Sequence, residues 1–538
     1  MQAMGIHSIE LVVLLMMILV VAFAAAAKRL HTPYPIILVI GGLILSLVPH
    51  GPHIELNPQL VFLAILPPLL FAAAYVTSWR DFRYNLVSIA MLAFGLVGFT
   101  VFGVAAASRW ILPGFDWRMG LVLGAVVSTT DAIAATSIFG RLGLPKRIVD
   151  VVEGESLVND ATGLLALQFS TALLVTGHTP SLADGAWTLL YLVFGSIAIG
   201  LLMGQLIYLI ALKITDAPIE ITISLIAPYF AYFAAESLRA SGVMATVACG
   251  LYLGHKSSLY LSRGARLTGQ AVWETLTFIL NGFVFLLIGF QLPYVLYDIR
   301  NHGLGGLLLL GLLFSGVVIL LRFIWVYPGA AISFFIRRRI FKQVETLPRP
   351  KALFVIGWSG MRGVVALAAA ISLPRILNSG KPFPERNLMI FLTFSVIFVT
   401  LVLQGLTLPS LIRRLGLAGT AGHNVEEEAA RRAMVEAALA YLEQNRDDAP
   451  GEFASLYDEL IRSQRRRLNT LEKTDSAEDG TRPEDYQRWR ELSRQVGAIQ
   501  RATVLLLRNQ NKINDEVMRK LERELDLNEA RFSLSELG

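Results

Sequence analysis

The sequence predicts an all-α polytopic membrane protein, with about thirteen transmembrane helices followed by a helical cytoplasmic domain. The first observation behind this fold class is the composition: of 538 residues, 54% are hydrophobic and only 16% are charged, and the mean hydropathy is +0.57. Such a balance is too apolar for a soluble protein of this size. The second observation is that 24 of the 41 acidic residues lie after residue 420. The chain therefore divides into a transmembrane domain at 1–415 and a polar domain at 416–538.

Transmembrane spans are expected wherever about 20 mostly apolar residues follow one another. The first span ends in a run of alanines, but Lys28 and Arg29 follow it and no basic residue precedes it. We therefore expect a retained helix and not a cleaved signal peptide. The predicted spans are residues 9–27, 34–49, 58–78, 85–107, 120–139, 148–175, 188–212, 219–236, 242–255, 268–295, 304–329, 351–373 and 388–412.

The charge of the loops predicts how the chain lies in the membrane. If the N-terminus is outside, the inner loops hold most of the loop Lys and Arg, including Arg337 to Arg339. The positive-inside rule thus favours an external N-terminus and a cytoplasmic C-terminus in the cell (inner) membrane. These basic residues belong beside the lipid bilayer and do not indicate a nucleic-acid partner. The single cysteine, Cys249, lies in an apolar run and excludes a disulfide framework and a cysteine-based metal site.

Two predicted spans contain polar or glycine-rich breaks. Residues 128–131 (Ser-Thr-Thr-Asp) interrupt span 120–139, and residues 357–363 (Gly-Trp-Ser-Gly-Met-Arg-Gly) interrupt span 351–373. Each break lies about eleven residues, or roughly 16 Å, into its span and so near the midplane. The two spans are seven apart and run in opposite directions, as two inverted repeats require. Broken helices at corresponding places in inverted repeats are typical of the binding site of a secondary transporter.

The string Gly-Glu-Ser-Leu-Val-Asn-Asp at residues 154–160 carries polar groups into an apolar span. Ionisable residues at the bilayer centre are costly and are kept mainly where they pair, bind ions or relay protons. Helical spacing places Ser156 and Asp160 on one face, and Glu155 and Asn159 on the adjacent one. Asp160 can hold either a proton or a metal ion, and Ser156 can add a neutral oxygen ligand for a hard ion such as Na⁺.

The other buried charges predict structural roles. Glu155 needs a cation, and we expect Arg362 in span 12 to pair with it as a brace, with Arg322 in span 11 as the second candidate. Asp131 can neutralise the exposed amides of a half-helix at its break, where Thr129 or Thr130 offers a freed carbonyl. The competing interpretation is that such polar groups only join helices together by hydrogen bonds. For Ser156, this structural role and ion ligation fit the sequence equally well.

Two other function classes fit parts of the sequence. Residues 357–360 match the Gly-x-Ser-Gly pattern of intramembrane serine proteases, but all eight histidines lie at span ends or outside spans, so none can activate Ser359. We therefore do not expect an enzyme. A cation channel is the second alternative, because a charged centre between broken helices can also conduct, although inverted repeats favour a carrier.

Several motifs, in this order, resemble the monovalent cation/proton antiporters, in the bacterial sodium/proton exchanger branch. The resemblance covers most of residues 9–415 and is most specific at residues 154–160. The residues that match the family's motifs are Leu66-Pro67-Pro68-Leu69-Leu70-Phe71, Thr130-Asp131, Gly154-Glu155-Ser156-Leu157-Val158-Asn159-Asp160, Ser241-Gly242-Val243-Met244-Ala245 with Gly250, and Gly360-Met361-Arg362-Gly363.

The resemblance implies a homodimeric antiporter with a dimerisation part, a moving six-helix core and no organic cofactor. It implies exchange of cytoplasmic Na⁺ for external H⁺ by alternating access, with both ions competing for one carboxylate. The implied residues are Asp160 as the carrier carboxylate with Asn159 before it, Ser156 and the backbone of Thr130 as further Na⁺ ligands, Asp131 at the crossed unwound helices, and Glu155 with Arg362 as a structural ion pair. Thr129 and Arg322 are expected beside these groups.

Two positions bear on the ion and on the stoichiometry. Relatives often carry an acid directly after the phenylalanine of the span 3 motif, where this chain has Ala72. The selectivity among Na⁺, Li⁺ and K⁺ therefore stays open, and a K⁺-selective antiporter is an alternative. Asn159 stands where an electrogenic relative would have a second acid, so the resemblance implies electroneutral exchange of one ion for one proton.

The polar domain is predicted to be helical, and a regulatory function is one interpretation of it. Residues 425–445 are rich in Ala, Glu and Arg with a periodic apolar face, which predicts a helix. Further helices are expected at about 452–471 and within 484–526, with an exposed linker at 475–484.

Overall fold

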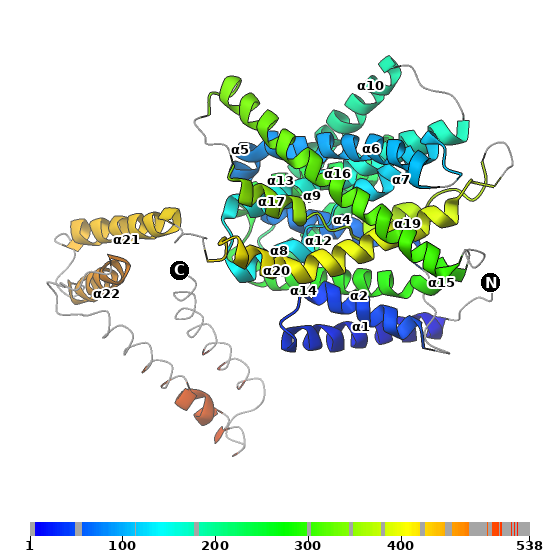
Figure 1. Cartoon of the computed structure of the whole chain (residues 1–538). Helices are drawn as coiled ribbons and strands as arrows, with labels where there is room; N and C mark the ends of the chain where they lie inside the picture. The colour runs from blue at the N-terminus through cyan, green and yellow to red at the C-terminus, as the bar shows by residue number, and fades with distance from the viewer. Residues whose placement is uncertain are drawn as a thin grey trace. The chain divides into compact units, whose positions relative to one another are not determined.

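The computed structural model describes residues 6–48, 56–112, 114–176, 182–297, 303–343, 348–377, 382–419, 425–446 and 454–472, and short runs between 492 and 525. The chain divides into two compact units, Met1–Thr420 and Ala421–Gly538, and each is described by itself (Figure 1).

The first unit is helical, and no β-strand forms among its described residues beyond one isolated bridge between Ile376 and Pro382. Its first helices are α1 (Ile6–Arg29), α2 (Tyr34–Ser46), α3 (Pro58–Leu60), α4 (Leu66–Val76), α5 (Trp79–Ala90), α6 (Val97–Ile111), α7 (Trp117–Ser128), α8 (Ile133–Leu142), α9 (Lys146–Thr176) and α10 (Leu182–Leu190). The others are α11 (Ser196–Ala211), α12 (Ala217–Ser237), α13 (Gly242–Tyr260), α14 (Arg263–Phe290), α15 (Leu292–Tyr297), α16 (Leu304–Arg339), α17 (Pro350–Trp358), α18 (Val364–Ile371), α19 (Arg386–Val399) and α20 (Gly405–Arg414).

In the described part of the first unit, four π-helical segments continue one helix into the next. They are η1 (Val61–Ile65) before α4, η2 (Met91–Leu96) between α5 and α6, η3 (Tyr191–Gly195) before α11, and η4 (Thr400–Gln404) between α19 and α20. At η1 the sequence indicates the cause, because Pro67 and Pro68 follow it after one intervening residue and lack the N–H groups that would bond the preceding turn.

Each of the thirteen predicted ranges coincides with a helix, or with helices joined through a π segment or a break. Among the described residues, ten helical stretches are long and apolar enough to cross a membrane, and Tyr34–Ser46 is a shorter apolar helix. The all-α membrane fold is therefore confirmed, whereas the count of thirteen spans stays a prediction.

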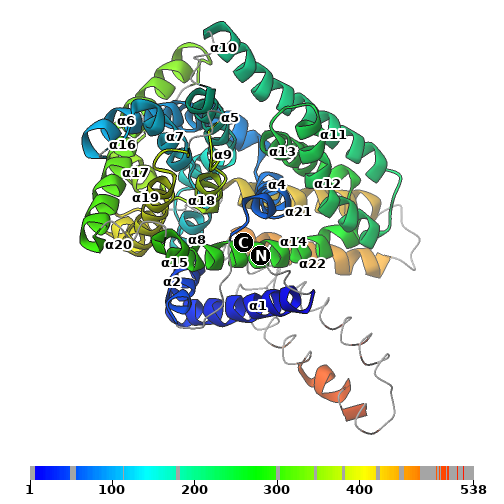
Figure 2. The same cartoon turned by 90° about the vertical axis from the view of Figure 1, so that its right-hand side faces the viewer.

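The helices of the first unit form two groups (Figure 2). One group contains α5 to α9 and α16 to α20, and the other contains α1, α2, α4 and α11 to α14. They meet where α9 packs against α13 and where α18 packs against α3 and η1. A cavity of about 460 Å³ lies at this junction and is lined by Leu157 and Val158 of α9 and by Met244 and Val247 of α13. The polar string of α9 thus lies between the two groups.

In the second unit, two helices form an antiparallel pair. They are α21 (Val425–Arg446) and α22 (Ala454–Glu472), at the ranges that the sequence predicts. Val435, Leu439 and Ile461 form their small apolar core. Arg446 at the end of α21 pairs with Asp458 near the start of α22 at 2.7 Å, as the antiparallel arrangement allows. The helices expected within 484–526 fall largely outside the described residues, and the linker at 475–484 lies wholly outside them.

Candidate functional site

The two predicted breaks lie against each other in the group that contains α9. Helix α7 ends at Ser128 and α8 begins at Ile133, while α17 ends at Trp358 and α18 begins at Val364. The amide of Asp131 donates to the carbonyl of Met361 at 2.8 Å, so the two unwound segments are joined directly. Each break leaves one half-helix with free carbonyls and the next with free amides, in the interior of the bundle.

Asp131 accepts a hydrogen bond from a backbone amide at the start of α8. Its Oδ1 accepts a hydrogen bond from the backbone N–H of Ile133 at 2.8 Å. A carboxylate at the N-terminus of a helix neutralises the partial positive charge of the exposed amides. One oxygen of the Asp131 carboxyl is thus already engaged within its own break.

Two arginines donate hydrogen bonds to the carbonyl groups at the C-terminal ends of α7 and α17. Arg362 donates from Nε to the carbonyl of Val127 at 3.2 Å, in the last turn of α7, and from its guanidinium to the carbonyl of Gly360. Arg322 donates from Nε to the carbonyl of Gly357 at 3.2 Å, in the last turn of α17. A cation at a helix C-terminus is stabilised by the carbonyl dipoles. Each broken helix therefore has one arginine at the C-terminal end of its first half.

The predicted pairing of Glu155 with Arg362 is wrong in this structure, and the second candidate, Arg322, is the partner. Two hydrogen bonds join Arg322 to Glu155, at 2.5 and 2.8 Å, and both side chains are 1% exposed. Gly360 explains the choice, because a Cβ there would collide with the Nε and Cδ of Arg322. The glycine opens the path by which Arg322 reaches Glu155, while Arg362 turns toward α7.

Polar side chains of α9 hold the first break in place. Ser156 Oγ donates to the carbonyl of Thr130 at 3.0 Å and accepts from the amide of Ala132 at 3.2 Å. Asn159 Nδ2 donates to the hydroxyl of Thr130, and that hydroxyl donates to Glu155 Oε1 at 3.2 Å. The string 154–160 thus acts on both sides of the break, and its two helical faces meet the same unwound segment.

Asp160 differs from these groups. It is the fifteenth of the 31 residues of α9 and is 7% exposed. Among the described residues, no group donates a hydrogen bond to its carboxyl. Two more buried oxygens in this region, Asn159 Oδ1 and Thr129 Oγ1, also lack a hydrogen-bond partner in the described part of the chain.

Thr129 lies close to the turn of α9 that follows Asp160. A Cβ placed at Gly163 would collide with Cγ2 of Thr129 and would lie 3.0 Å from Oγ of Ser128. Gly163 stands three residues after Asp160 and therefore on a neighbouring part of the same helix face. The end of α7 and the carboxylate of α9 are thereby brought together at one depth of the bundle.

Two threonines that the sequence did not indicate form hydrogen bonds at the π-helical segments. Thr162 Oγ1 donates to the carbonyl of Ala93 at 2.6 Å, inside π segment η2. Thr400, in η4, accepts from the amide of Arg362 at 3.2 Å. Hydropathy does not distinguish a π segment from an α-helix, so these two contacts had no signal in the sequence. Both tie a π segment to the site, in keeping with the frequent presence of π segments at functional sites.

We predict that Gly363→Ala disrupts the crossing of the two breaks. A Cβ at Gly363 would lie 2.5 Å from Oδ2 and 2.6 Å from Cβ of Asp131. Overpacking of this kind costs about 1 to 3 kcal/mol. We expect a lower thermal unfolding midpoint and reduced transport. Gly98→Ala is the matched control, because nothing lies within 4 Å of a Cβ at Gly98; equal behaviour of the two variants would contradict the close contact.

Comparisons with known proteins decide the family. The family described as "Sodium/hydrogen exchanger, transmembrane" matches residues 14–414. The chain belongs to this family. The exchanger family consists of transporters and not enzymes, and Oγ of Ser359, the serine of the protease-like pattern, donates to the carbonyl of Ile356 at 3.1 Å.

Relatives of the exchanger extend over most of its length. An uncharacterized Na⁺/H⁺ exchanger of Mycobacterium tuberculosis is 34% identical over 532 residues, which cover 96% of each chain. A "Sodium, potassium, lithium and rubidium/H(+) antiporter" of Bacillus subtilis is 33% identical over 413 residues, covering 74% of this chain and 61% of the relative. The Na⁺/H⁺ antiporter ApNhaP of Aphanothece halophytica is 32% identical over 414 residues, covering 76% and 75% of the two chains.

A solved structure shares the exchanger's fold. The sodium proton antiporter MjNhaP1 from Methanocaldococcus jannaschii superimposes with a TM-score of 0.59 at 20% identity, covering 75% of this chain and 97% of the other. This likeness supports the fold of the first unit.

Proposed function

We propose that this exchanger moves cytoplasmic Na⁺ outward and H⁺ inward across the plasma membrane, with both ions competing for Asp160. One observation carries the proposal: Asp160 is a buried carboxyl at mid-span that no described residue neutralises or hydrogen-bonds. An ionised carboxylate is not stable alone at this depth, so it must bind either a proton or a cation. A group that accepts either ion but not both is what coupled exchange requires.

Each of the other two acids beside the breaks has a described hydrogen-bond partner. Glu155 is held by two hydrogen bonds from Arg322, and Asp131 accepts from the first amide of α8. Of the three acids of the predicted site, Asp160 is therefore the one whose carboxyl has no donor among the described residues, and we assign the exchange to it. Its position beside the first break gives a cation access to oxygen ligands from two helices.

Neutral oxygens near Asp160 complete a ligand set. The carbonyl of Thr130 and Oγ of Ser156 bond to each other at 3.0 Å, and each oxygen retains a lone pair for a cation. Oδ1 of Asn159 and Oγ1 of Thr129 are buried oxygens without a partner in the described residues. A set of one carboxylate with neutral oxygens suits a hard monovalent cation. Asp160, Ser156 and Thr130 are the ligands that we propose for transported Na⁺.

The two helix groups provide a basis for alternating access. Helix α9 carries the site, and its Leu157 and Val158 face the 460 Å³ cavity between the groups. Movement of the group containing the breaks against the group containing α11 to α14 would open the site to each side in turn. We propose a homodimer in which the second group forms the fixed part, with the N-terminus outside and the C-terminus in the cytoplasm.

The proposed exchange is electroneutral, and its ion selectivity is the main alternative. Asn159 is neutral, so Asp160 is the one exchanging charge on this helix turn. The Bacillus subtilis relative is named for sodium, potassium, lithium and rubidium, and position 72 is alanine. A K⁺-selective antiporter is therefore the second candidate.

Proton flux from proteoliposomes tests both points. Purified protein is reconstituted into vesicles that contain a pH-sensitive dye, and the chloride salts of Na⁺, Li⁺ and K⁺ are added in turn. The membrane potential is clamped with valinomycin for Na⁺ and Li⁺, and with a permeant anion for K⁺. We expect Na⁺-driven flux that does not change with the clamped potential. A potential-dependent rate would contradict one-for-one exchange, a response to K⁺ alone would favour the second candidate, and conductive flux without coupling would indicate a channel.

A further inference from the structure

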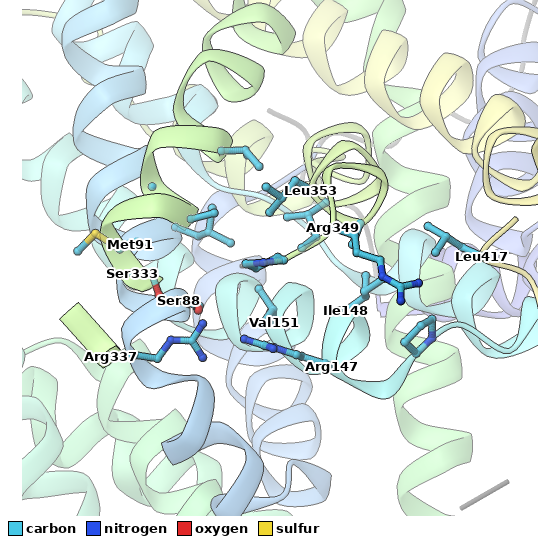
Figure 3. A pocket seen from close by; sticks show the side chains of 18 of the residues that line it. Ser88, Met91, Arg147, Ile148, Val151, Ser333, Arg337, Arg349, Leu353 and Leu417 are labelled. Carbon is cyan, nitrogen blue, oxygen red and sulfur yellow. Dashed lines mark hydrogen bonds between the residues drawn. The ribbon is translucent and has the colours of Figure 1, made fainter. Parts of the chain in front are cut away.

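A second cavity, of about 400 Å³, lies at the end of the bundle where α9 and α17 begin and α16 ends (Figure 3). Its walls come from α5 with η2, the first turns of α9, the last turns of α16, the first turns of α17 and the residues after α20. Its volume is within the range of small-molecule sites. It is separate from the ion site, which none of its lining residues forms.

Three arginines give this cavity its charge. They are Arg147 in the first turn of α9, Arg337 in the last turn of α16 and Arg349 directly before α17. In Figure 3 the side chains of Arg147 and Arg337 point toward one another, and Arg349 lies on the other side of Ile148. The residues that the structure gives as its lining include no Asp or Glu.

Hydroxyl groups add to the donors of the cavity. Ser88 of α5 and Ser333 of α16 both line it, and their hydroxyl oxygens lie 2.9 Å apart. Guanidinium forks match the oxygens of phosphate in geometry and bind it with paired, charge-assisted hydrogen bonds. The polar part of the cavity therefore suits a phosphate group better than a cation or a neutral ligand.

The rest of the lining is apolar. Met91, Leu92, Val326 and Leu353 belong to it. A phosphate bound by the arginines could thus carry an attached apolar portion into the space between α16 and α17. In the orientation proposed above, this end of the bundle faces the cytoplasm, where basic pockets between membrane helices meet anionic lipid head groups.

We propose that this cavity binds the phosphate group of an anionic ligand, which clamps together the ends of α9, α16 and α17. The cavity adjoins the structural ion pair of the ion site. Ile356 lines the cavity, and its carbonyl accepts from Arg322 at 3.0 Å; Val151 lines it one turn before Glu155. An occupied cavity therefore stabilises the helices that hold the breaks. The proposal does not depend on which cation is exchanged.

A thermal-unfolding assay on the purified full chain in detergent tests the proposal. The probes are inorganic phosphate as its choline salt, dioleoylphosphatidylglycerol in mixed micelles, and dioleoylphosphatidylcholine as the zwitterionic control, with choline chloride at equal ionic strength. We expect at least one phosphate probe to raise the unfolding midpoint by about 2 °C or more at saturation, because a ligand that binds only the folded state stabilises it.

Two variants decide whether the three arginines cause the shift. Arg349→Gln should remove it, and folding should tolerate this change because Arg349 is exposed and its side chain does not cap α17. Arg339→Gln is the matched control, since Arg339 is also exposed, lies two residues after Arg337 at the same helix end, and does not line the cavity. The double variant Arg147→Gln/Arg349→Gln serves as a second test of the same site.

Each outcome either supports or overturns the site. A shift with inorganic phosphate alone indicates a soluble phosphate ligand, and a shift with phosphatidylglycerol alone indicates a lipid head group held together with its chains. The proposal is overturned if neither probe shifts the midpoint, if phosphatidylcholine shifts it equally, if Arg349→Gln and the double variant respond like the wild type, or if Arg339→Gln loses the shift as well.

Discussion

Replacing Asp160 by asparagine is expected to abolish cation-driven proton flux while leaving a folded protein. The amide has nearly the volume of the carboxyl, and no described residue donates a hydrogen bond to Asp160, so the substitution breaks no described hydrogen bond. It does remove the group that we propose to bind both ions, because an amide neither releases a proton nor carries a charge. In proteoliposomes the flux should fall to the level of empty vesicles, and the size-exclusion profile and unfolding midpoint should match those of the wild type.

Asp216→Asn is the matched control for this experiment. Asp216 precedes α12, and its Oδ1 accepts from the amide of Ile219 at 3.3 Å. Asparagine caps a helix about as well as aspartate, so this variant loses the same charge without losing its contact. Wild-type flux is expected. If Asp160→Asn exchanged ions at a rate close to that of the control, the assignment of Asp160 would have to be abandoned.

Removing either partner of the Glu155–Arg322 pair is expected to destabilise the protein by about 3 to 5 kcal/mol, because a charge is then buried without a partner. Glu155→Gln and Arg322→Gln should each lower the unfolding midpoint and the yield of monodisperse protein. The double variant should recover part of the loss, since no uncompensated charge remains. The measurement is a double-mutant cycle on unfolding midpoints of the purified proteins.

The same cycle with Arg362 distinguishes the two candidate partners. Arg362 is also 1% exposed, but its described side-chain hydrogen bonds go to the carbonyls of Val127 and Gly360. Arg362→Gln should therefore be destabilising by itself, while its coupling to Glu155→Gln should be smaller than that of Arg322→Gln. A larger coupling of Glu155 to Arg362 would show that the pairing described above is wrong.

The helices and the depth of the site in the membrane could be predicted, because hydropathy and helical spacing carry that information. Apolar runs gave the position of each span, and the interruptions at 128–131 and 357–363 gave the two breaks. The spacing of Ser156 and Asp160 placed them on one face of α9, next to the break at Thr130. Of these positions, the structure brings Ser156 into direct contact with Thr130.

The partner of Glu155 could not be predicted because depth alone does not distinguish Arg322 from Arg362. Both arginines lie near the middle of their spans, and each can compensate an acid. The choice depends on the room beside Gly360 and on which carbonyls each broken helix leaves free, and both depend on tertiary packing. A hydropathy pattern also does not reveal the π segments η2 and η4. The structure shows that Thr162 donates to a carbonyl of η2 and that Thr400, in η4, accepts from the amide of Arg362.

The competition of the two ions for one carboxylate is tested most directly by initial rates of Na⁺-driven flux measured across a range of pH and Na⁺ concentration. If both ions bind Asp160, acidification should raise the KM for Na⁺ by about tenfold per pH unit in the acid range, because each cation displaces one proton. The maximal rate should stay unchanged when Na⁺ is saturating. A maximal rate that falls with acidification at constant KM would mean that protons act at another group, and it would contradict exchange at Asp160.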